Sequence, residues 1–344
     1  MDQESVQKND LQAIQINCVV CNSNSYKPLF YISPRRIVEC SNCGHEYVNP
    51  LPHPKSVPEC KFIPGEEESV GTQIDLAYIK KIFDRYGVKG GKLLDLGCGQ
   101  GRLERKLIES GWAQQDIYLM DTSERNIEVV KNKYPLSNFI HGDAQKGIGI
   151  NNYFDCVLMV EFLEHLANPA TALKNASNAL KQGGLFIMRG LPNNQSLEAF
   201  IGLEKWRMRQ FEQHNHFFNT GTFSTFAQNL SGVNILEFGT FLQEGYRSYD
   251  IERIARNIGV INESNDNQYI AYDGKIVQSS ELAESVLAKI KNVNFSDYKN
   301  RTKLTAQQIK SLLSGENIEE FFDTAALDPF LSPDFSVVMR KDGR

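Results

Sequence analysis

The chain has 344 residues, enough for one full α/β domain and a smaller accessory unit. Its 37 Lys and Arg residues stand against 42 Asp and Glu residues, a formal net charge of -5, and no long basic run concentrates positive charge, so we expect no nucleic-acid partner. No apolar stretch approaches the roughly 18 residues that a membrane span requires, and the polar first ten residues lack the apolar segment of a signal peptide. We therefore expect a cytoplasmic protein that makes no membrane contact.

Two CxxC pairs dominate the first 60 residues. Cys18 and Cys21 form one pair and Cys40 and Cys43 the other, with 18 residues between the pairs. An odd total of seven cysteines and a reducing compartment favour metal binding over disulfides, and this spacing lets two turns converge on one tetrahedral zinc ion. Four protein ligands would make the zinc structural. A disulfide, or a site that no longer binds metal, is the alternative. We predict a zinc-binding module over residues 1–60.

Residues 61–91 are predicted to form a linker and an entry helix. The stretch 61–73 is acidic and contains glycine, as linkers often do. After it, Ile74, Tyr78 and Ile82 recur at helical spacing until Gly87, which can end the helix.

The segment 92–250 alternates short apolar runs with amphipathic stretches. The runs are KLLDLG, IYLMD, NFIHGD, FDCVLMV and LFIMRG, an order that predicts a largely parallel sheet with helices on both faces. One helix should begin at Asn168 and Pro169, bury Leu173, Ala176 and Leu180, and end before Gly183.

Two further runs, 234–242 and 334–341, are predicted to close the same sheet. Residues 251–333 between them look mainly helical, and residues 334–344 supply the last strand. Such a long insertion is usually an element with a role of its own. It is either a lid over a substrate or an appendage that stabilises the chain or forms a homodimer.

The most informative segment is LLDLGCGQG, residues 93–101. A strand that ends in glycines brings backbone close to a ligand, and the spacing GxGxG differs from the GxGxxG of dinucleotide-binding folds. The segment resembles the first motif of class I S-adenosylmethionine-dependent methyltransferases. This resemblance implies a Rossmann-like, seven-stranded sheet, S-adenosylmethionine as cofactor, and Asp95 near its methionyl part.

Further motifs follow in the order of that family. Asp121, 26 positions after Asp95, is placed to accept hydrogen bonds from both ribose hydroxyls. Asp143 resembles the residue that accepts from the adenine amino group, and FDCVLMVEFLEHLANP resembles the motif whose strand end borders the methyl group. Taken singly, the glycines could serve only a tight turn, and Asp121 and Asp143 could each be a helix cap. These explanations do not account for the occurrence of all the motifs in the order of the family. The candidate cofactor-binding residues are Asp95, Gly97, Cys98, Gly99, Gly101, Asp121, Thr122, Asp143, Ala144 and Glu161.

Methyl transfer to a hydroxyl requires alignment of the acceptor and removal of a proton. Two clusters offer bases, EFLEHL (161–166) and QHNHFF (213–218). The run LPNNQS followed by HNHFFNTGTF resembles the region after the fifth strand in ubiquinone-biosynthesis O-methyltransferases and their relatives, with His214 at the matching position. The candidate catalytic residues are His165, His214 and Glu161. An imidazole that only hydrogen-bonds the sheet edge is the alternative for each histidine.

The spacing ExxEH adds a metal hypothesis. In some ubiquinone-pathway enzymes and in small-RNA 2′-O-methyltransferases the same arrangement holds a divalent cation. That resemblance implies a second metal site with the ligands Glu161, Glu164, His165 and His214.

The pattern CxxCGxxYxNPxP in the second half of the zinc module resembles the module that precedes methyltransferase domains in sugar and natural-product pathways. We therefore expect a small-molecule acceptor, a hydroxyl of a sugar or secondary metabolite. Two alternatives remain. The module could guide methylation of RNA or protein, with Arg35 and Arg36 as contacts, or the chain could be a cofactor-binding scaffold without turnover.

Overall fold

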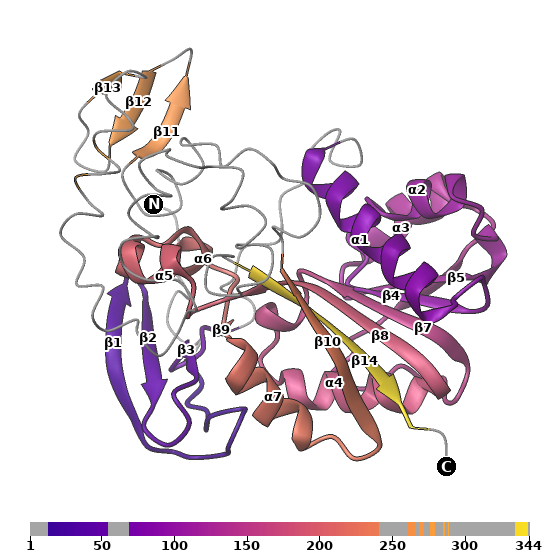
Figure 1. Ribbon diagram of the computed structural model, residues 1–344, viewed down its shortest axis with the longest axis horizontal. Coiled ribbons are helices and arrows are strands. Elements are labelled where there is room, and N and C mark those ends of the chain that lie inside the picture. Colours follow the sequence, from indigo (N-terminus) through magenta and orange to yellow (C-terminus); the bar gives the residue numbers. More distant parts are fainter. Residues whose placement is uncertain are drawn as a thin grey trace, which may run out of the picture.

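The computed structural model describes residues 13–53, 69–240, 261–265, 268–271, 276–278, 285, 288 and 334–342. A seven-stranded mixed sheet with helices on both faces forms the larger part, and a four-stranded antiparallel sheet packs at one end of it (Figure 1). The large sheet has the order β10-β14-β8-β7-β4-β5-β6, and its seven strands match the number that the resemblance implied. Its strands are β4 Leu93–Leu96, β5 Ile117–Asp121, β6 Asn138–His141, β7 Phe154–Val160, β8 Leu180–Pro192, β10 Val233–Thr240 and β14 Asp334–Lys341.

The order of the strands creates a switch point beside β4. From β4 the chain adds β5 and β6 on one side, then returns to place β7 and β8 on the other, all of them parallel. β14 runs antiparallel between β8 and β10, which confirms the two predicted closing strands. In open α/β sheets, ligands bind outside the carboxyl ends of the strands at such a switch point. The candidate site is therefore expected where β4, β5 and β7 end.

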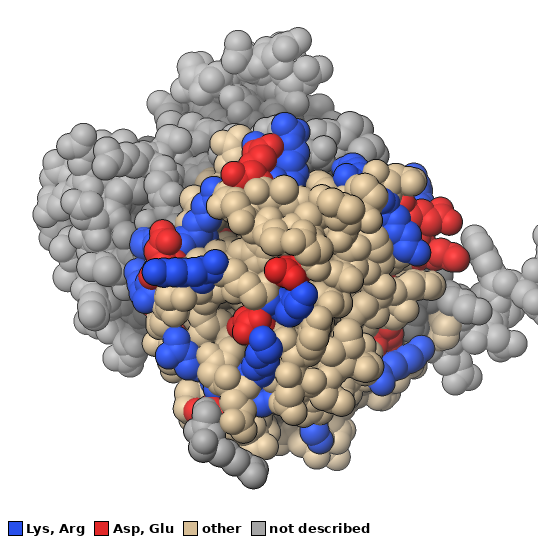
Figure 2. Space-filling model, turned by 90° about the vertical axis from the view of Figure 1, so that its right-hand side faces the viewer, with Lys and Arg blue, Asp and Glu red and all other residues tan. Residues whose placement is uncertain are grey.

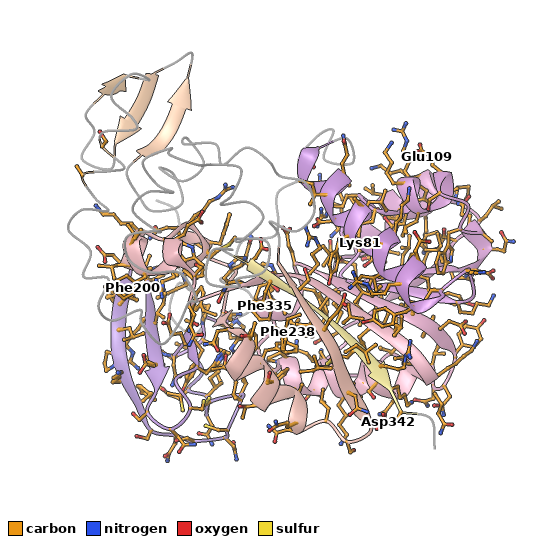
Figure 3. The ribbon with its side chains drawn as sticks, in the orientation of Figure 1. Lys81, Glu109, Phe200, Phe238, Phe335 and Asp342 are labelled. Carbon is orange, nitrogen blue, oxygen red and sulfur yellow. The ribbon has the colours of Figure 1, made fainter. Side chains whose placement is uncertain are left out.

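Helices α1 Val70–Tyr86, α2 Glu104–Glu109 and α3 Glu124–Lys133 cover one face of the sheet, and α4 Pro169–Ala179 and α7 Thr220–Gln228 cover the other (Figure 1). On the first face Ile79 and Ile82 pack with Leu93. On the second face Phe223 lies against Phe238 and Phe335, whose ring centroids are 6.0 Å apart (Figure 3). Strands with both faces buried explain why the apolar runs are continuous instead of alternating.

Two predicted helix boundaries can be compared with the structure. α1 begins after Ser69, whose side chain accepts from the amide of Thr72, and it ends at Gly87 in the left-handed conformation, as expected. α4 begins at the predicted cap, where the Asn168 side chain accepts from the amide of Thr171. It ends before Leu180, which was expected inside the helix but pairs with Phe154 as the first residue of β8.

The cysteine-containing module forms an antiparallel sheet of β1 Tyr26–Ile32, β2 Arg35–Cys40 and β3 Glu46–Val48. A fourth strand, β9 His216–Phe217, joins its edge from the second half of the chain, with Tyr47 opposite His216. The short helices α5 Leu197–Gly202 and α6 Arg207–Gln210 precede β9. The module and the larger domain therefore share one sheet, which sequence reasoning did not predict.

The segment 251–333, expected to be mainly helical, also contains strands that were not predicted. The strands β11 Ile261–Asn265, β12 Gln268–Ala271 and β13 Ile276–Gln278 form a three-stranded antiparallel sheet. Ile, Val and Tyr favour strands, and an Asp-Gly dipeptide between β12 and β13 in the sequence favours a tight turn. The sequence stretches that look helical in this region, 249–259, 280–290 and 304–314, lie almost wholly outside the described residues. Across the described part of the chain, the helices are too short or too polar to span a membrane.

Candidate functional site

The loop after β4 is shaped by glycines. Gly97 and Gly101 have positive φ values of 76° and 78°. A Cβ atom on Gly97 would lie 2.4 Å from the Phe162 ring, and one on Gly101 would lie 2.6 Å from the Tyr134 ring. Both positions therefore need glycine for conformation and for space. The amides of Gly97 and Cys98 donate to the Met120 carbonyl at 2.9 and 3.1 Å, which ties the loop to β5.

Asp121, at the end of β5, holds this loop in place. One carboxylate oxygen accepts from the amide of Gly99 at 3.0 Å, and the other accepts from the amide of Ser123 at 2.8 Å and from the side chain of Asn126 at 3.2 Å. The side chain is only half-buried. It therefore fixes the glycine loop and the start of α3 while part of its surface remains accessible to a ligand.

The other predicted cofactor-binding residues lie along the same edge. Asp143 follows β6, and its carboxylate accepts from the amide and side chain of Gln145 at 2.9 and 3.2 Å. Ala144 is buried beside it, and Thr122 is exposed after β5. The structure thus places the predicted set at the carboxyl ends of β4, β5, β6 and β7. What each residue binds remains a prediction.

A buried acidic pair underlies the loop. Asp95 in β4 and Glu104 at the start of α2 are both buried. Burial raises the pKa of Asp95 and raises that of Glu104 well above its usual range, and the repulsion between the two carboxylates adds to the shift of Glu104. The folded protein therefore favours the protonated form of Glu104 more than the unfolded chain does. Sequence reasoning missed Glu104, although an acidic residue three positions after the last glycine was a visible signal.

A second polar network joins α1 to the loop. Asp75 in α1 accepts from Arg102, which follows Gly101, at 2.9 Å, and from the buried Arg189 in β8. The Arg189 guanidinium also donates to Ser336 at 3.0 Å and lies over the Tyr78 ring. These contacts tie the entry helix, the glycine loop and β8 together. They were not predicted, because nothing in the sequence pairs residues this far apart.

Three of the four residues in the predicted second metal site come together. Glu164 and His165 lie in a single turn, Leu163–His165, after β7, and His214 lies between α6 and β9. One candidate ligand atom from each lies within 4.8 Å of those from the other two. Glu161 is not part of this group: its side chain is 62% exposed, and its carboxylate lies 3.7 Å from Arg102. Its backbone has a positive φ of 51°, a strained conformation of the kind that clusters at functional sites.

Hydrogen bonds fix the orientation of both rings. Nδ1 of His165 donates to the Gln213 carbonyl at 3.2 Å, and Nδ1 of His214 donates to the Met208 carbonyl at 3.0 Å. A carbonyl only accepts, so in both rings Nε2 carries the free lone pair. The two rings are 4.8 Å apart between centroids. A ring whose Nδ1–H is held by a backbone carbonyl is typical of histidines that bind a metal or accept a proton through Nε2.

Burial controls the charges of this cluster. It lowers the pKa of His165 to about 4 and that of His214 well below its usual range, so both imidazoles are neutral at pH 7. It raises the pKa of Glu164, whose carboxylate oxygens are fully buried and have no protein hydrogen-bond donor among the described residues. An unsatisfied buried carboxyl is costly unless a proton or a cation accompanies it.

His216 has a different environment from His214. Its Nε2 donates to the Leu166 carbonyl at 3.0 Å, and its Nδ1 faces Nε2 of His45 at 3.3 Å. Both ring nitrogens are engaged within the protein, and burial lowers the pKa of the ring to about 4. His216 therefore joins the two sheets and is not available as a base.

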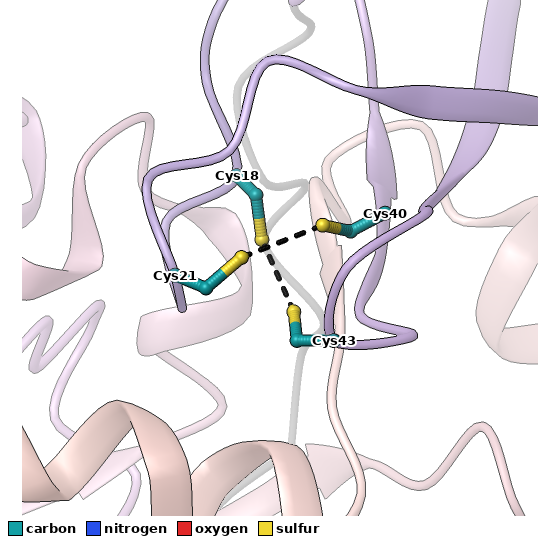
Figure 4. A group of neighbouring side chains, drawn as sticks. All are labelled: Cys18, Cys21, Cys40 and Cys43. Atoms are coloured by element: carbon teal, nitrogen blue, oxygen red, sulfur yellow. Dashed lines mark hydrogen bonds between the residues drawn. The ribbon is translucent and has the colours of Figure 1, made fainter.

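The four predicted zinc ligands converge (Figure 4). Sγ of Cys18 lies 3.5 Å from Sγ of Cys43, and Sγ of Cys21 lies 3.5 Å from Sγ of Cys40. The cysteines are not bonded to one another. Four thiolates around a tetrahedral zinc ion would be about 3.8 Å apart, close to the observed spacing. The cluster could therefore hold zinc with little rearrangement.

Sequence comparisons relate the chain to methyltransferases. Residues 73–239 match a family model described as a methyltransferase domain. The chain is 29% identical over 191 residues to a ubiquinone biosynthesis O-methyltransferase from Cereibacter sphaeroides, which covers 54% of this chain and 75% of the relative. It is 31% identical over 147 residues to the protein of the same name from Roseobacter denitrificans, which covers 41% and 58%.

Among solved structures, the YcgJ protein from Bacillus subtilis has a TM-score of 0.44 at 13% identity and covers 77% of this chain and 98% of that one. An S-adenosylmethionine-dependent methyltransferase from Clostridium acetobutylicum has a TM-score of 0.40 at 18% identity and covers 50% and 84%. The family match, the curated relatives and the site define residues 73–239 as a class I methyltransferase domain. The chain is an S-adenosylmethionine-dependent methyltransferase.

Proposed function

We propose that this enzyme methylates a hydroxyl of a small molecule, a sugar or secondary metabolite. The observation that carries the proposal is the pair of neutral, buried imidazoles of His165 and His214 beside Glu164, at the carboxyl end of β7. In the reaction the acceptor oxygen attacks the methyl carbon, the C–S bond breaks, and S-adenosylhomocysteine leaves. The hydroxyl proton passes to Nε2 of His165 or His214, which is the free acceptor in each ring. The relatives named O-methyltransferases support oxygen as the acceptor atom.

The residues at the strand ends fit S-adenosylmethionine. In this proposal the glycine loop approaches the methionyl part, and the half-buried Asp121 accepts from the ribose hydroxyls. Asp143 and Ala144 border the adenine. Glu161, beside Arg102, lies at the end of the strand that borders the methyl group. Together the strand ends align cofactor and acceptor, which supplies much of the catalysis in a displacement reaction.

The cluster of Glu164, His165 and His214 also fits a divalent cation. It offers one carboxylate oxygen and two imidazole nitrogens whose Nδ1 atoms are already held by carbonyls. When bound, such a cation lowers the pKa of a coordinated hydroxyl and orients it. Glu161 lies outside this donor set. Exhaustive chelation that leaves methyl transfer at full rate excludes a catalytic cation and leaves the imidazoles as bases.

Methylation of a macromolecule has less support. Arg35 is 4% exposed, and its guanidinium contacts only the protein interior. Arg36 is half-buried and donates to the Asn49 carbonyl at 2.7 Å and to the Tyr26 hydroxyl at 3.3 Å. On the face shown in Figure 2, described acidic and basic side chains alternate without a patch of one sign. A nucleic-acid site would need a concentration of positive charge.

The proposal is tested by calorimetry and an acceptor screen. We expect micromolar binding of S-adenosylmethionine and S-adenosylhomocysteine, and release of S-adenosylhomocysteine with at least one hydroxylated sugar or phenolic compound. Radiolabelled methyl transfer to total RNA or to a protein extract is measured in parallel. Label found only in RNA or protein would overturn the proposed acceptor class.

A further inference from the structure

Arg35 lies far in sequence from the methyltransferase motifs but contacts the loop that carries His214. It stands at the start of β2, and its guanidinium donates to three backbone carbonyls: those of Arg209 at 2.7 Å, Phe211 at 2.7 Å and His214 at 3.1 Å. Arg209 lies in the last turn of α6, where helix carbonyls lack helical partners, and the carbonyl of Phe211, which follows α6, also accepts from the amide of His214 at 3.1 Å. A single buried cation thus satisfies carbonyls along six residues of loop.

The rest of the module contacts the same loop. Glu46 in β3 forms an ion pair with the buried Arg209 at 2.7 Å, and the guanidinium of Arg209 lies over the rings of Phe30 and Trp206. The amide of Val48 donates to the Asn215 carbonyl at 2.8 Å. These contacts are mostly buried, so they hold the loop as a rigid part of the module.

The loop in turn orients His214. Nδ1 of its ring donates to the Met208 carbonyl, six residues earlier in the same loop, which leaves Nε2 as the acceptor in a ring that lies beside His165 and Glu164. If the segment 208–214 were to lose its fixed shape, the carbonyl that sets the ring's tautomer would move with it. The position of the ring therefore depends on Arg35, although Arg35 does not touch the ring itself.

We infer that Arg35 is a positioning residue for His214, and that the cysteine-containing module supplies part of the active site of the methyltransferase domain. The inference rests on the proposed function, in which His214 accepts a proton or binds a cation. Arginine is needed because a planar guanidinium reaches three carbonyls at once, whereas the ammonium of lysine acts as a point donor.

The test uses selective ¹⁵N labelling of the six histidines and two-bond ¹H–¹⁵N NMR spectra of the full-length protein, with His214 assigned from His214→Gln. We expect the wild type to show a neutral, Nδ1-protonated His214 ring. In Arg35→Lys and Arg35→Met we expect the ¹⁵N signals of the His214 ring to shift, or to split into signals of both tautomers. Arg36→Met, on the same strand but bonded only within the module, is the matched control and should leave the His214 signals unchanged.

Zinc content and binding of S-adenosylhomocysteine are measured on every variant. Retention of both, within twofold of wild type, together with an altered His214 signature supports the inference. An unchanged signature in Arg35→Lys and Arg35→Met overturns it, and so does loss of zinc from both, which would assign Arg35 to folding of the module. The spectra need no acceptor, so failure to find a hydroxylated substrate overturns the proposed function without affecting this result.

Discussion

Asp121 serves both the resting loop and, in our proposal, the cofactor. It fixes the amide of Gly99 and offers its remaining acceptor capacity to the ribose. We predict that Asp121→Ala weakens binding of S-adenosylhomocysteine by about 10- to 100-fold, because hydrogen bonds to a charged group contribute about 1.5 to 3 kcal/mol. Isothermal titration calorimetry measures the change. Asp116→Ala, which removes a carboxylate paired with Lys92 at the opposite end of β5, should stay within twofold. Equal affinity in the Asp121 variant would remove the ribose assignment.

Glu104 makes stability depend on pH. Its folded-state pKa lies well above the ordinary 4.5, so the folded protein holds a proton that the unfolded chain releases. This contribution to stability is complete below pH 4.5 and is lost as pH rises toward the folded pKa, by up to about 1.4 kcal/mol per pH unit. We predict that Glu104→Gln loses less stability than wild type between pH 5 and 8 in urea titrations. Glu109→Gln, on the exposed side of α2, should follow the wild-type dependence of stability on pH. If Glu104→Gln also follows the wild-type dependence, Glu104 does not have a raised pKa in the folded protein.

At the level of single elements, the structure agrees best with the sequence where the pattern is local. Short stretches of sequence, each of about ten residues or fewer, were enough to predict the glycine loop, each CxxC pair and each closing strand. β9 is only two residues long and gains its partner, β3, from about 170 positions away, so periodicity could not reveal it. The burial of Glu164 depends on the same long-range packing. The strands β11 to β13 were missed because the flanking segments have helical periodicity.

Helix α7 offers a test at this scale because its start is tightly specified. The Asn219 side chain accepts from the amide of Thr222 at 2.8 Å, and the Thr222 hydroxyl accepts from the amide of Asn219 at 3.0 Å. Asn219 also donates to the Asn194 side chain at 2.8 Å, which links the helix to the turn after β8. We predict that Asn219→Ala lowers the free energy of unfolding by about 1 to 2 kcal/mol in chemical denaturation. Thr225→Ala, on the exposed side of the helix, should change it by less than about 0.5 kcal/mol, and equal losses would argue against the cap.

For the molecule as a whole, the shared sheet connects the thiol cluster to the candidate active site. β2 runs from Arg35 to Cys40, and β3 follows Cys43 and pairs with β9, so two strands lead from the cysteine cluster to the loop that carries His214. Sequence spacing predicted the cysteine cluster and the methyltransferase motifs separately. The contact between the two parts depends on buried interactions of Arg35 and Glu46 with residues 209–214. No local sequence pattern indicates these interactions.

We therefore predict that the effects of zinc loss extend beyond the module. Cys40→Ser should lose zinc, because three thiolates bind it less tightly than four, and the binding energy of a structural zinc is folding energy. Hydrogen exchange should then become faster in residues 13–53 and also in 206–218, while β4 and β5 keep the protection of wild type. Ser41→Ala changes an exposed residue between Cys40 and Cys43 and is the control. It should leave both regions protected. Faster exchange confined to residues 13–53 would show that the methyltransferase domain holds the His214 loop without the module.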